Sequence, residues 1–405
     1  MRVLVLSSAF PNPTRPAYGV FVRERARHVA EHCETVVVAP IPWFPFNRLF
    51  RGADRAGAPP VVRDGNLTVY HPRFLCVPAV TKCLDGLLYF LSLLPVVARM
   101  RRHFDFDLID AHFSYPDGAA AVLLGRVFRR PVVVTLRGSH DLRNAAFRLR
   151  RPQIRSALRA AARVVAVSES LAKFAIELGV PAEQVRVIPN GVDPEQFAPG
   201  DRTAARAALG LPSDRRILLG IGNLLEGKGH HRILETLPAV IARRPDVLYV
   251  AVGGSASRGY QRQLDDLVTR GGLAHHVRFV GSRPHQEVPC WLAAADLFCL
   301  ATAAEGWSNA ITEALACGVP VVTTRVGGNA EIVREGRDGF LVPYWDAEAF
   351  QGAMLTALDT RWDRQEISAR ARATGWTRTA EQVAQQFQEV LADGAAPTPS
   401  GWSPR

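Results

Sequence analysis

The chain has 405 residues, of which 48% are hydrophobic and 21% charged, a composition that indicates a globular protein with room for two domains of ordinary size. Residues 1–195 contain 27 Lys and Arg against 16 Asp and Glu, so this half carries the whole net charge of +11 and the remainder is neutral. A basic half predicts an anionic partner, and a membrane surface is favoured over nucleic acid because the aromatic content is only 8% and no helix-turn-helix or RNA-recognition pattern occurs.

Short apolar runs alternate with segments of helical spacing along the chain. Strands are expected at 2–7, 34–40, 107–111, 131–136, 163–168 and 185–188, and in a second series at 216–222, 247–253, 277–280, 296–300 and 320–324. Helices are expected at 20–32, 117–129, 228–243, 259–271, 285–294 and 310–317. This alternation predicts an α/β fold with parallel sheets, and the turn-rich segment 188–194 divides it into two doubly wound domains facing across a cleft.

The first residues read as a buried strand and not as a signal peptide, which predicts a cytosolic protein. The most apolar stretch, 84–98, contains Asp85 and Pro95 and is too short to span a bilayer. Apolar residues beside arginines instead suit a contact with a membrane surface.

Three candidate site positions lie in the first half. Gly19 precedes the helix at 20–32, where it would allow a ligand to approach the backbone or simply cap the helix. His112 and Arg137 each follow the carboxyl end of a strand, so both are expected at one edge of the same sheet. For a single histidine in that place, a structural role and a ligand contact are equally plausible.

Seven arginines occupy residues 143–163. They form either a solvated face or a contact for an anionic membrane or acceptor, for which the candidates are Arg148, Arg150, Arg151 and Arg155.

Asp105 and Asp107 match the D-x-D pattern of metal-binding glycosyltransferases, but they lie at a junction between a helix and a strand. We interpret the match as chance and expect no metal site.

The loop from Gly222 to His230 follows the first strand of the second half and opens a helix. Its glycines permit close approach to a ligand, the start of a helix favours anions, and Lys228 suits a diphosphate. A plain surface turn is the alternative. The loop also contains Asn223.

The segment 303–320 contains two carboxylates, Glu305 and Glu313, eight positions apart. On a helix this spacing is a little over two turns, so both can face one cleft. The helix that carries Glu313 begins after Gly306, Trp307 and Ser308, and the backbone N–H groups from Trp307 through Asn309 to Ala310 are suited to a phosphate or sugar oxygen. Together these features describe a nucleotide-sugar site.

With these motifs the chain resembles the family 4 retaining glycosyltransferases of the GT-B fold, over residues 1 to about 390. The strongest motif is E-x7-E, from Glu305 to Glu313, supported by 188–193, by the loop with Lys228 and by 326–333. The patterns at 110–112 and 115–118 are similar to those of enzymes of bacterial exopolysaccharide and teichuronic acid assembly.

The resemblance implies an acceptor-side domain at 1–189, completed by a C-terminal helix at about 376–391, and a donor-binding domain at 190–375. The tail at 393–405 is expected to be disordered. It further implies a retaining, metal-independent transferase without a cofactor. The basic charge and the apolar segments of the first half, and not the resemblance, place it at the inner face of the cytoplasmic membrane as an expectation. The substrates would be a nucleotide-diphosphate sugar and a polyprenyl-linked or saccharide acceptor of surface-glycan synthesis.

Residue roles follow from the same resemblance. His112 and Glu305 would contact the donor sugar, Lys228 the diphosphate and Glu313 the ribose. Gly19, Gly222 and the segment 306–310 would line the donor site. Two departures stand out: many members have Arg at the position of Asn223 and His at the position of Arg137, so Arg137 could supply the missing charge.

The alternatives are a sugar-nucleotide epimerase of the same fold and a non-catalytic partner subunit. A phosphorylase would need a lysine late in the chain, and none follows Lys228.

Overall fold

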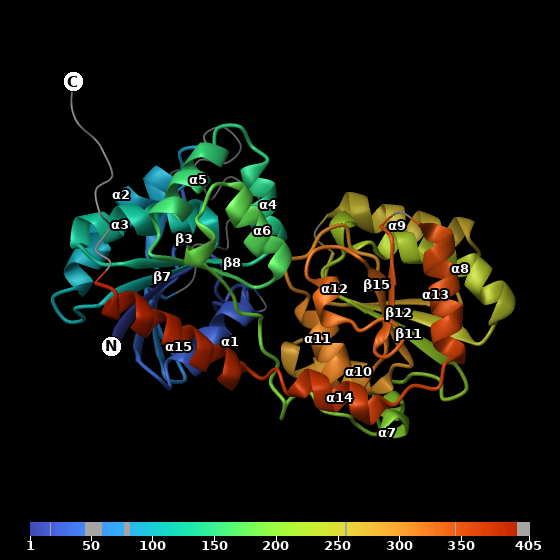
Figure 1. Cartoon of the computed structure of the whole chain (residues 1–405). Coiled ribbons are helices and arrows are strands. Elements are labelled where there is room, and N and C mark those ends of the chain that lie inside the picture. Colours follow the sequence, from blue (N-terminus) through green and yellow to red (C-terminus); the bar gives the residue numbers. More distant parts are fainter. Residues whose placement is uncertain (17, 45–58, 77–81, 256, 345, 395–405) are drawn as a thin grey trace. The chain divides into compact units, whose positions relative to one another are not determined.

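The computed structural model describes the chain except residues 17, 45–58, 77–81, 256, 345 and 395–405. The chain divides into two compact units, Met1–Gly191 with the residues from Trp376 onward, and Val192–Gly375 (Figure 1). The boundary falls in the turn-rich segment that follows the first series of strands. Most of the tail expected at 393–405 lies outside the described residues.

The first unit is built on a sheet in the order β10-β9-β8-β7-β1-β2-β5-β4. Its strands are β1 (Arg2–Leu6), β2 (Glu34–Val38), β4 (Val61–Asp64), β5 (Leu67–Tyr70), β7 (Leu108–His112), β8 (Val132–Leu136), β9 (Arg163–Ala166) and β10 (Val185–Val187). All neighbours are parallel except β4, which is antiparallel to β5. A separate parallel pair joins β3 (Ile41–Trp43) and β6 (Arg73–Leu75).

Helices cover both faces of this sheet (Figure 1). They are α1 (Val20–Val29), α2 (Asp85–Met100), α3 (Ala119–Phe128), α4 (Ser139–Ala145), α5 (Arg151–Ala160), α6 (Glu169–Glu177) and α15 (Trp376–Ala392), with short turns at Ser114–Gly118 and Ala182–Gln184. Helix α15 returns to this unit because Val383, Phe387 and Val390 lie on one side of it, packed with α1 and the sheet in one core.

The second unit has a fully parallel sheet in the order β13-β12-β11-β14-β15-β16. Its strands are β11 (Arg216–Ile221), β12 (Val247–Val252), β13 (Val277–Gly281), β14 (Leu297–Leu300), β15 (Val321–Thr324) and β16 (Gly339–Val342). Its helices are α7 (Arg202–Ala208), α8 (His230–Arg243), α9 (Arg258–Arg270), α10 (Val288–Ala294), α11 (Asn309–Ala316), α12 (Asn329–Ile332), α13 (Ala347–Asp359) and α14 (Arg364–Arg372), with short turns at Glu226–Lys228 and His285–Glu287.

Alternate residues of each central strand enter two different cores. Ile217 and Leu219 of β11 pack into the core beneath α10 and α11, whereas Leu218 packs into the core beneath α8 and α13. This alternation is expected for a sheet buried on both faces. The GT-B prediction of two doubly wound parallel-sheet domains is therefore confirmed at the level of the two sheets, with the antiparallel edge strand β4 as a difference.

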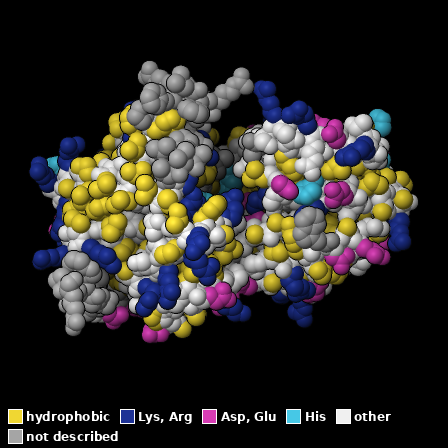
Figure 2. Space-filling view, turned by 90° about the horizontal axis from the view of Figure 1, so that it is seen from above, with side chains coloured by type: hydrophobic (Ala, Val, Ile, Leu, Met, Phe, Trp, Pro, Cys, Tyr) yellow, Lys and Arg dark blue, Asp and Glu magenta, His cyan; other side chains and the backbone are white. Residues whose placement is uncertain are grey.

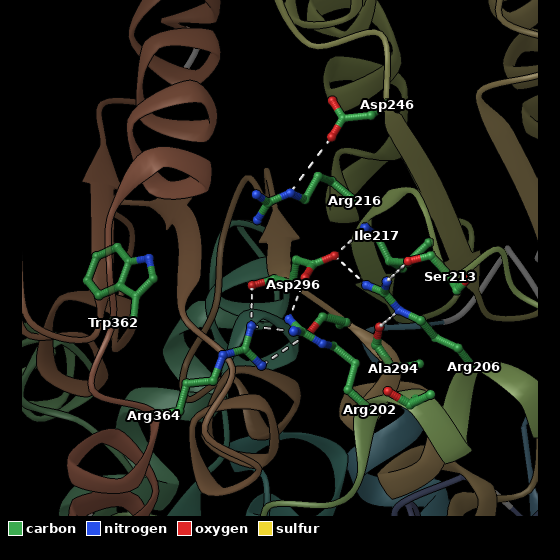
Figure 3. A network of polar contacts seen from close by, with 12 residues as sticks. Arg202, Arg206, Ser213, Arg216, Ile217, Asp246, Ala294, Asp296, Trp362 and Arg364 are labelled. Atoms are coloured by element: carbon green, nitrogen blue, oxygen red, sulfur yellow. Dashed lines mark hydrogen bonds and ion pairs between the residues drawn. The ribbon is translucent and has the colours of Figure 1, made fainter.

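Polar contacts fix helices to the amino end of the second sheet (Figure 3). Asp296, at the start of β14, accepts from Arg202 Nη1 at 2.8 Å and from Arg206 Nη2 at 2.5 Å, while Arg364 donates to its main-chain oxygen at 3.0 Å. These arginines join α7 and α14 to the start of β14. The opposite, carboxyl end of the sheet is where ligands of such folds bind.

Candidate functional site

The carboxyl ends of β11 and β14 carry an ion pair between two predicted site residues. Lys228 Nζ lies 2.6 Å from Glu305 Oε1. The lysine side chain is 33% exposed, whereas that of Glu305 is 9% exposed. Because β11 and β14 are the strands at which the winding of the sheet reverses, the pair occupies the crevice that ligands use in open α/β sheets.

The two loops that carry this pair are held together by their backbones. The single O–H of Thr302 is shared between Gly227 O, 2.9 Å from Oγ1, and Glu305 Oε1, 3.2 Å from Oγ1, and Ala303 N donates to Gly227 O at 2.9 Å. Gly229 has φ +75°, and a Cβ there would lie 1.9 Å from Ala301 O, so only glycine permits this approach. The position of Lys228 relative to Glu305 is thus fixed by the fold.

Glu313 has a partner that the sequence did not indicate. Its Oε1 lies 3.1 Å from His285 Nε2, and His285 also packs against the ring of Phe197 at 5.4 Å. Glu313 is on α11, and His285 precedes α10, so the contact ties two helices of the second unit. A ribose contact through Glu313 remains a prediction and would share this carboxylate with His285.

The turn before α11 supplies hydrogen-bond donors. Ile311 N and Thr312 N both donate to Ser308 O, so the N–H groups of Asn309 and Ala310 precede the first bonds within the helix. The indole Nε1 of Trp307 is buried without a partner among the described residues. Gly306 is buried beside them, and Gly222 and the exposed Asn223 follow β11 at the same end of the sheet.

In the first unit, His112 is fully buried at the end of β7 with both ring nitrogens bonded. Arg137 donates to Nδ1 from Nη2 at 2.6 Å and from Nε at 3.1 Å. A guanidinium only donates, so the proton is on Nε2, which donates to Asp110 Oδ2 at 3.2 Å. A sugar contact through a ring nitrogen would require one of these bonds to open.

Burial and the neighbouring Arg137 lower the pKa of His112 to about 3, so the ring is neutral at physiological pH. Burial alone would raise the pKa of Asp110, but Arg25, at 3.3 Å, and His112 lower it below its usual value. Arg25 and Asp110 were not predicted as members of this site. The signal for Asp110 was available, since it lies two residues before His112 and therefore on the same face of the strand.

Arg137 is the unusual member of this group. Its guanidinium is buried, and Nη1 donates to Asn190 Oδ1 at 2.7 Å. Within the described part of the chain, no carboxylate lies at ion-pair distance from it. Burial, and then Arg25, lower its pKa well below the usual value. An unpaired buried cation is costly, and this one stands at the carboxyl end of β8.

A second buried carboxylate lies at the carboxyl ends of β1 and β7. Asp117 accepts from Ser8 N at 2.5 Å, from Ser8 Oγ at 2.8 Å and from the Tyr89 hydroxyl at 2.8 Å. Burial raises the pKa of Asp117 to about 7. These bonds connect α2 to the sheet.

Gly19 caps α1 in a left-handed conformation with φ +77°, and a Cβ there would lie 2.3 Å from Ala9 O. Close packing of its own chain therefore accounts for this glycine, whether or not a ligand also approaches it.

The predicted arginine patch is only partly exposed. Arg148, Arg151 and Arg155 are exposed, whereas Arg150 donates to Asn144 Oδ1 at 2.7 Å and lies over the Phe147 ring. Arg163 is buried and pairs with Glu389.

The D-x-D aspartates have partners within the first unit. Asp105 pairs with Arg101 and Arg130, and Asp107 Oδ2 accepts from Arg2 N at 2.8 Å. Among the described residues, no helix is both long and apolar enough to cross a membrane.

Two family models match the chain. The model described as Glycosyltransferase Family 4 matches residues 18–196, and the one described as Glycosyl transferases group 1 matches residues 201–374. The D-inositol 3-phosphate glycosyltransferase 2 of Catenulispora acidiphila is 30% identical over 307 residues, covering 71% of this chain and 72% of that protein. The putative teichuronic acid biosynthesis glycosyltransferase TuaC of Bacillus subtilis is 28% identical over 379 residues, covering 91% of this chain and 90% of that protein.

Solved structures agree on the fold. Sucrose-phosphate synthase from Thermosynechococcus elongatus has a TM-score of 0.80 at 21% identity, covering 97% of this chain and all of that one. Anabaena Alr3699/HepE, solved in complex with UDP-glucose, has a TM-score of 0.71 at 22% identity, covering 96% of this chain and 100% of that one. These similarities show the GT-B fold, and the two family models and the 30% identical relative show that the chain is a glycosyltransferase. The chain belongs to glycosyltransferase family 4.

Proposed function

We propose that this glycosyltransferase transfers a sugar from a nucleotide-diphosphate sugar, with retention of the anomeric configuration and without a metal ion. The observation that carries the proposal is the Lys228–Glu305 pair in the crevice between β11 and β14. The structures of Anabaena HepE with UDP and with UDP-glucose support a donor of this class.

The chemistry needs charge stabilisation more than a nucleophile. As the bond to the diphosphate breaks, the sugar approaches an oxocarbenium ion and negative charge grows on the leaving oxygen. Lys228 and the N–H groups in the first turn of α11 would stabilise that charge, because they are fixed before the reaction. Both bonds to Glu305 fall on Oε1, which leaves Oε2 to accept from a sugar hydroxyl.

Arg137 is proposed to compensate for Asn223. Asp110 and Asp141 lie near enough to oppose the lowering of the Arg137 pKa by burial, but no carboxylate among the described residues pairs directly with its guanidinium, so an anion such as the donor diphosphate would supply a direct counter-charge. His112, held neutral by Arg137, would then position that guanidinium through Nδ1.

The acceptor is proposed to be lipid-linked or a saccharide in surface-glycan synthesis, reached at the inner face of the cytoplasmic membrane. Similarity to TuaC over most of the chain and the excess of basic residues in the first 195 support this assignment. The exposed Arg148, Arg151 and Arg155 are the proposed contacts for anionic lipid or acceptor, with Arg150 holding the segment in place.

The test begins with a thermal-shift panel of UDP- and GDP-sugars, since a ligand that binds only the folded state raises the melting temperature. Nuclear magnetic resonance of the product formed from the stabilising donor then gives its anomeric configuration. We expect retention. An inverted product, or no donor that stabilises the protein, would contradict the proposal.

A further inference from the structure

Exposed hydrophobic side chains are concentrated in the first unit. Of the twelve large hydrophobic residues that are exposed in the described part of the chain, eleven lie in this unit and only Leu225 in the second. In the space-filling view, hydrophobic side chains form a broad area on the first unit (Figure 2). A contiguous exposed apolar area typically marks an interaction surface.

Helix α2 carries several of these exposed residues. Leu84, at its N-cap, and Leu87 are each 47% exposed, and Leu91 is 53% exposed. They recur every three or four residues and so lie on one side of the helix. Tyr89 and Leu93 point the other way and are fully buried, so α2 is apolar on both sides and only one of them packs within the protein.

Neighbouring segments extend the exposed side of α2. Leu75 N donates to Ser92 Oγ at 3.2 Å, which places the exposed Leu75 beside the helix. Gln153 Nε2 donates at 2.9 Å both to Cys83 O and to Leu149 O, which places the loop before α5 at the start of α2. That loop exposes 56% of Phe147 and 67% of Leu149. We define the leucine face as Leu75, Leu84, Leu87, Leu91, Phe147 and Leu149.

Positive charge borders the leucine face. Arg148 and Arg151 are exposed next to Leu149, and Arg99 and Arg102 are exposed at the far end of α2. The acidic residue of α2, Asp85, is buried and paired with Lys82 at 3.2 Å. An apolar centre with a cationic border matches the interface of an anionic bilayer. Two copies of this face would instead bring their arginines together.

We propose that the leucine face inserts into the surface of an anionic lipid bilayer, with Arg148 and Arg151 at the lipid phosphates. This proposal depends on the proposed function only where it takes the acceptor to be lipid-linked. The buried side of α2 reaches the carboxyl end of the sheet, where Tyr89 donates to Asp117 at 2.8 Å. Docking through α2 would therefore hold that end of the first sheet near the membrane, as a lipid-borne acceptor requires.

The test is co-sedimentation of the full chain with vesicles of phosphatidylcholine mixed with phosphatidylglycerol, and with vesicles of phosphatidylcholine alone. We expect binding to the mixed vesicles that weakens as salt is added. Leu87→Gln with Leu91→Gln should lower the partition coefficient on the order of tenfold, because less apolar area leaves water. Arg148→Gln with Arg151→Gln should lower it by about 25-fold, at about fivefold per arginine.

Matched control variants remove exposed aliphatic and arginine side chains that lie outside the leucine face. Val61→Gln with Ile176→Gln removes two exposed aliphatic side chains on β4 and α6, and Arg243→Gln with Arg270→Gln removes two exposed arginines of the second unit. Both control pairs should bind like the wild type. Circular dichroism melts should show that the leucine variant is folded.

Three results would overturn the proposal: no binding to the mixed vesicles, equal binding to phosphatidylcholine alone, or wild-type binding by the leucine variant. A dimer that the leucine substitutions abolish, without vesicle binding, would show instead that the face joins two copies. Vesicle binding is measured without a nucleotide sugar, so this experiment tests the membrane proposal independently of the proposed sugar transfer. Donor turnover without vesicles should be unchanged in the leucine variant.

Discussion

The two units have similar sheets, but they differ in the charge of their chains and in how exposed the charged groups are at the carboxyl ends of their strands. The first has a basic surface with exposed leucines, and its charged groups at the sheet edge are buried and bonded to one another. The chain from residue 196 onward has no net charge, and the Lys228–Glu305 pair of the second unit is partly open to solvent. A partly exposed ion pair can exchange its partner for a ligand at small cost, whereas a buried network resists change. We therefore propose that the second unit binds most of the donor and that the first contacts the membrane and the acceptor.

The strongest test of this division of roles between the two units removes one member of the Lys228–Glu305 pair. Lys228→Ala or Glu305→Ala should each reduce turnover on the order of a hundredfold or more, because each removes a group proposed to bind the donor more strongly in the transition state. Steady-state kinetics with the donor found in the panel measures the effect. Lys173→Ala and Glu348→Ala, which remove exposed groups of the same kinds, should retain wild-type rates. Wild-type turnover in the Lys228 and Glu305 variants would refute the assignment.

A smaller effect is expected from the buried cation of the first unit. Arg137→Gln should weaken donor binding about tenfold, because a charge-assisted contact to the diphosphate is lost. Arg137 is proposed to lack a direct ion pair until an anion binds. Without ligand, the variant should therefore be at least as stable as the wild type in denaturant titrations, because a buried charge without a direct ion pair has been removed. Loss of stability with unchanged donor affinity would show that Arg137 is only structural.

Buried histidines in both units, above all His112 and His230, make stability depend on pH. Burial lowers the pKa of His112 to about 3, together with Arg137, and that of His230 to about 4. In the unfolded chain both bind a proton near pH 6.5, so their contribution to stability is present above that pH and is lost as the pH falls towards 4. Asp117, with a raised pKa, opposes this loss over the same range.

We expect urea titrations to show lower wild-type stability at pH 4.5 than at pH 7, by a few kcal/mol. His230→Gln should lose part of this difference, and so should His112→Gln. An unchanged difference in both variants would mean that other groups cause it.

The smallest effect is expected from metal removal. Activity in EDTA should stay within about twofold of the untreated enzyme, because a lysine and helix N–H groups can stabilise the diphosphate without a metal. Asp105→Ala should leave the rate unchanged, since Asp105 pairs with Arg101 and Arg130. Loss of activity in EDTA that Mn²⁺ restores would show that the D-x-D match has a function.

The central strands of the two sheets were predictable because buried parallel strands are continuous apolar runs, whereas the strands β4, β5 and β16 at the ends of the sheets were not predicted. For example, the strand expected at 107–111 is β7, Leu108–His112. Short elements such as β3 and β6 were not predicted, because three residues carry little periodicity. Helix α2 was predicted only as an apolar segment, because residues on both of its sides are apolar and the amphipathic pattern is weak.

For the candidate site, sequence motifs identified single residues but not their partners. Lys228 and Glu305 were both predicted, yet their direct contact depends on loops that are 77 residues apart in the chain. His285 and Asn190 were missed for the same reason, since each meets its partner only through the tertiary fold. Asp110 could have been found from strand alternation alone.

The most direct measurement of the central claim is donor affinity by isothermal titration calorimetry, with the nucleotide-diphosphate sugar identified in the panel. The division between the units predicts that Lys228→Ala binds on the order of tenfold or more weakly than the wild type, because a diphosphate cation is lost. It predicts unchanged affinity in Arg148→Gln with Arg151→Gln. Equal affinity in all three proteins, or a loss confined to the Arg148 and Arg151 variant, would contradict the account.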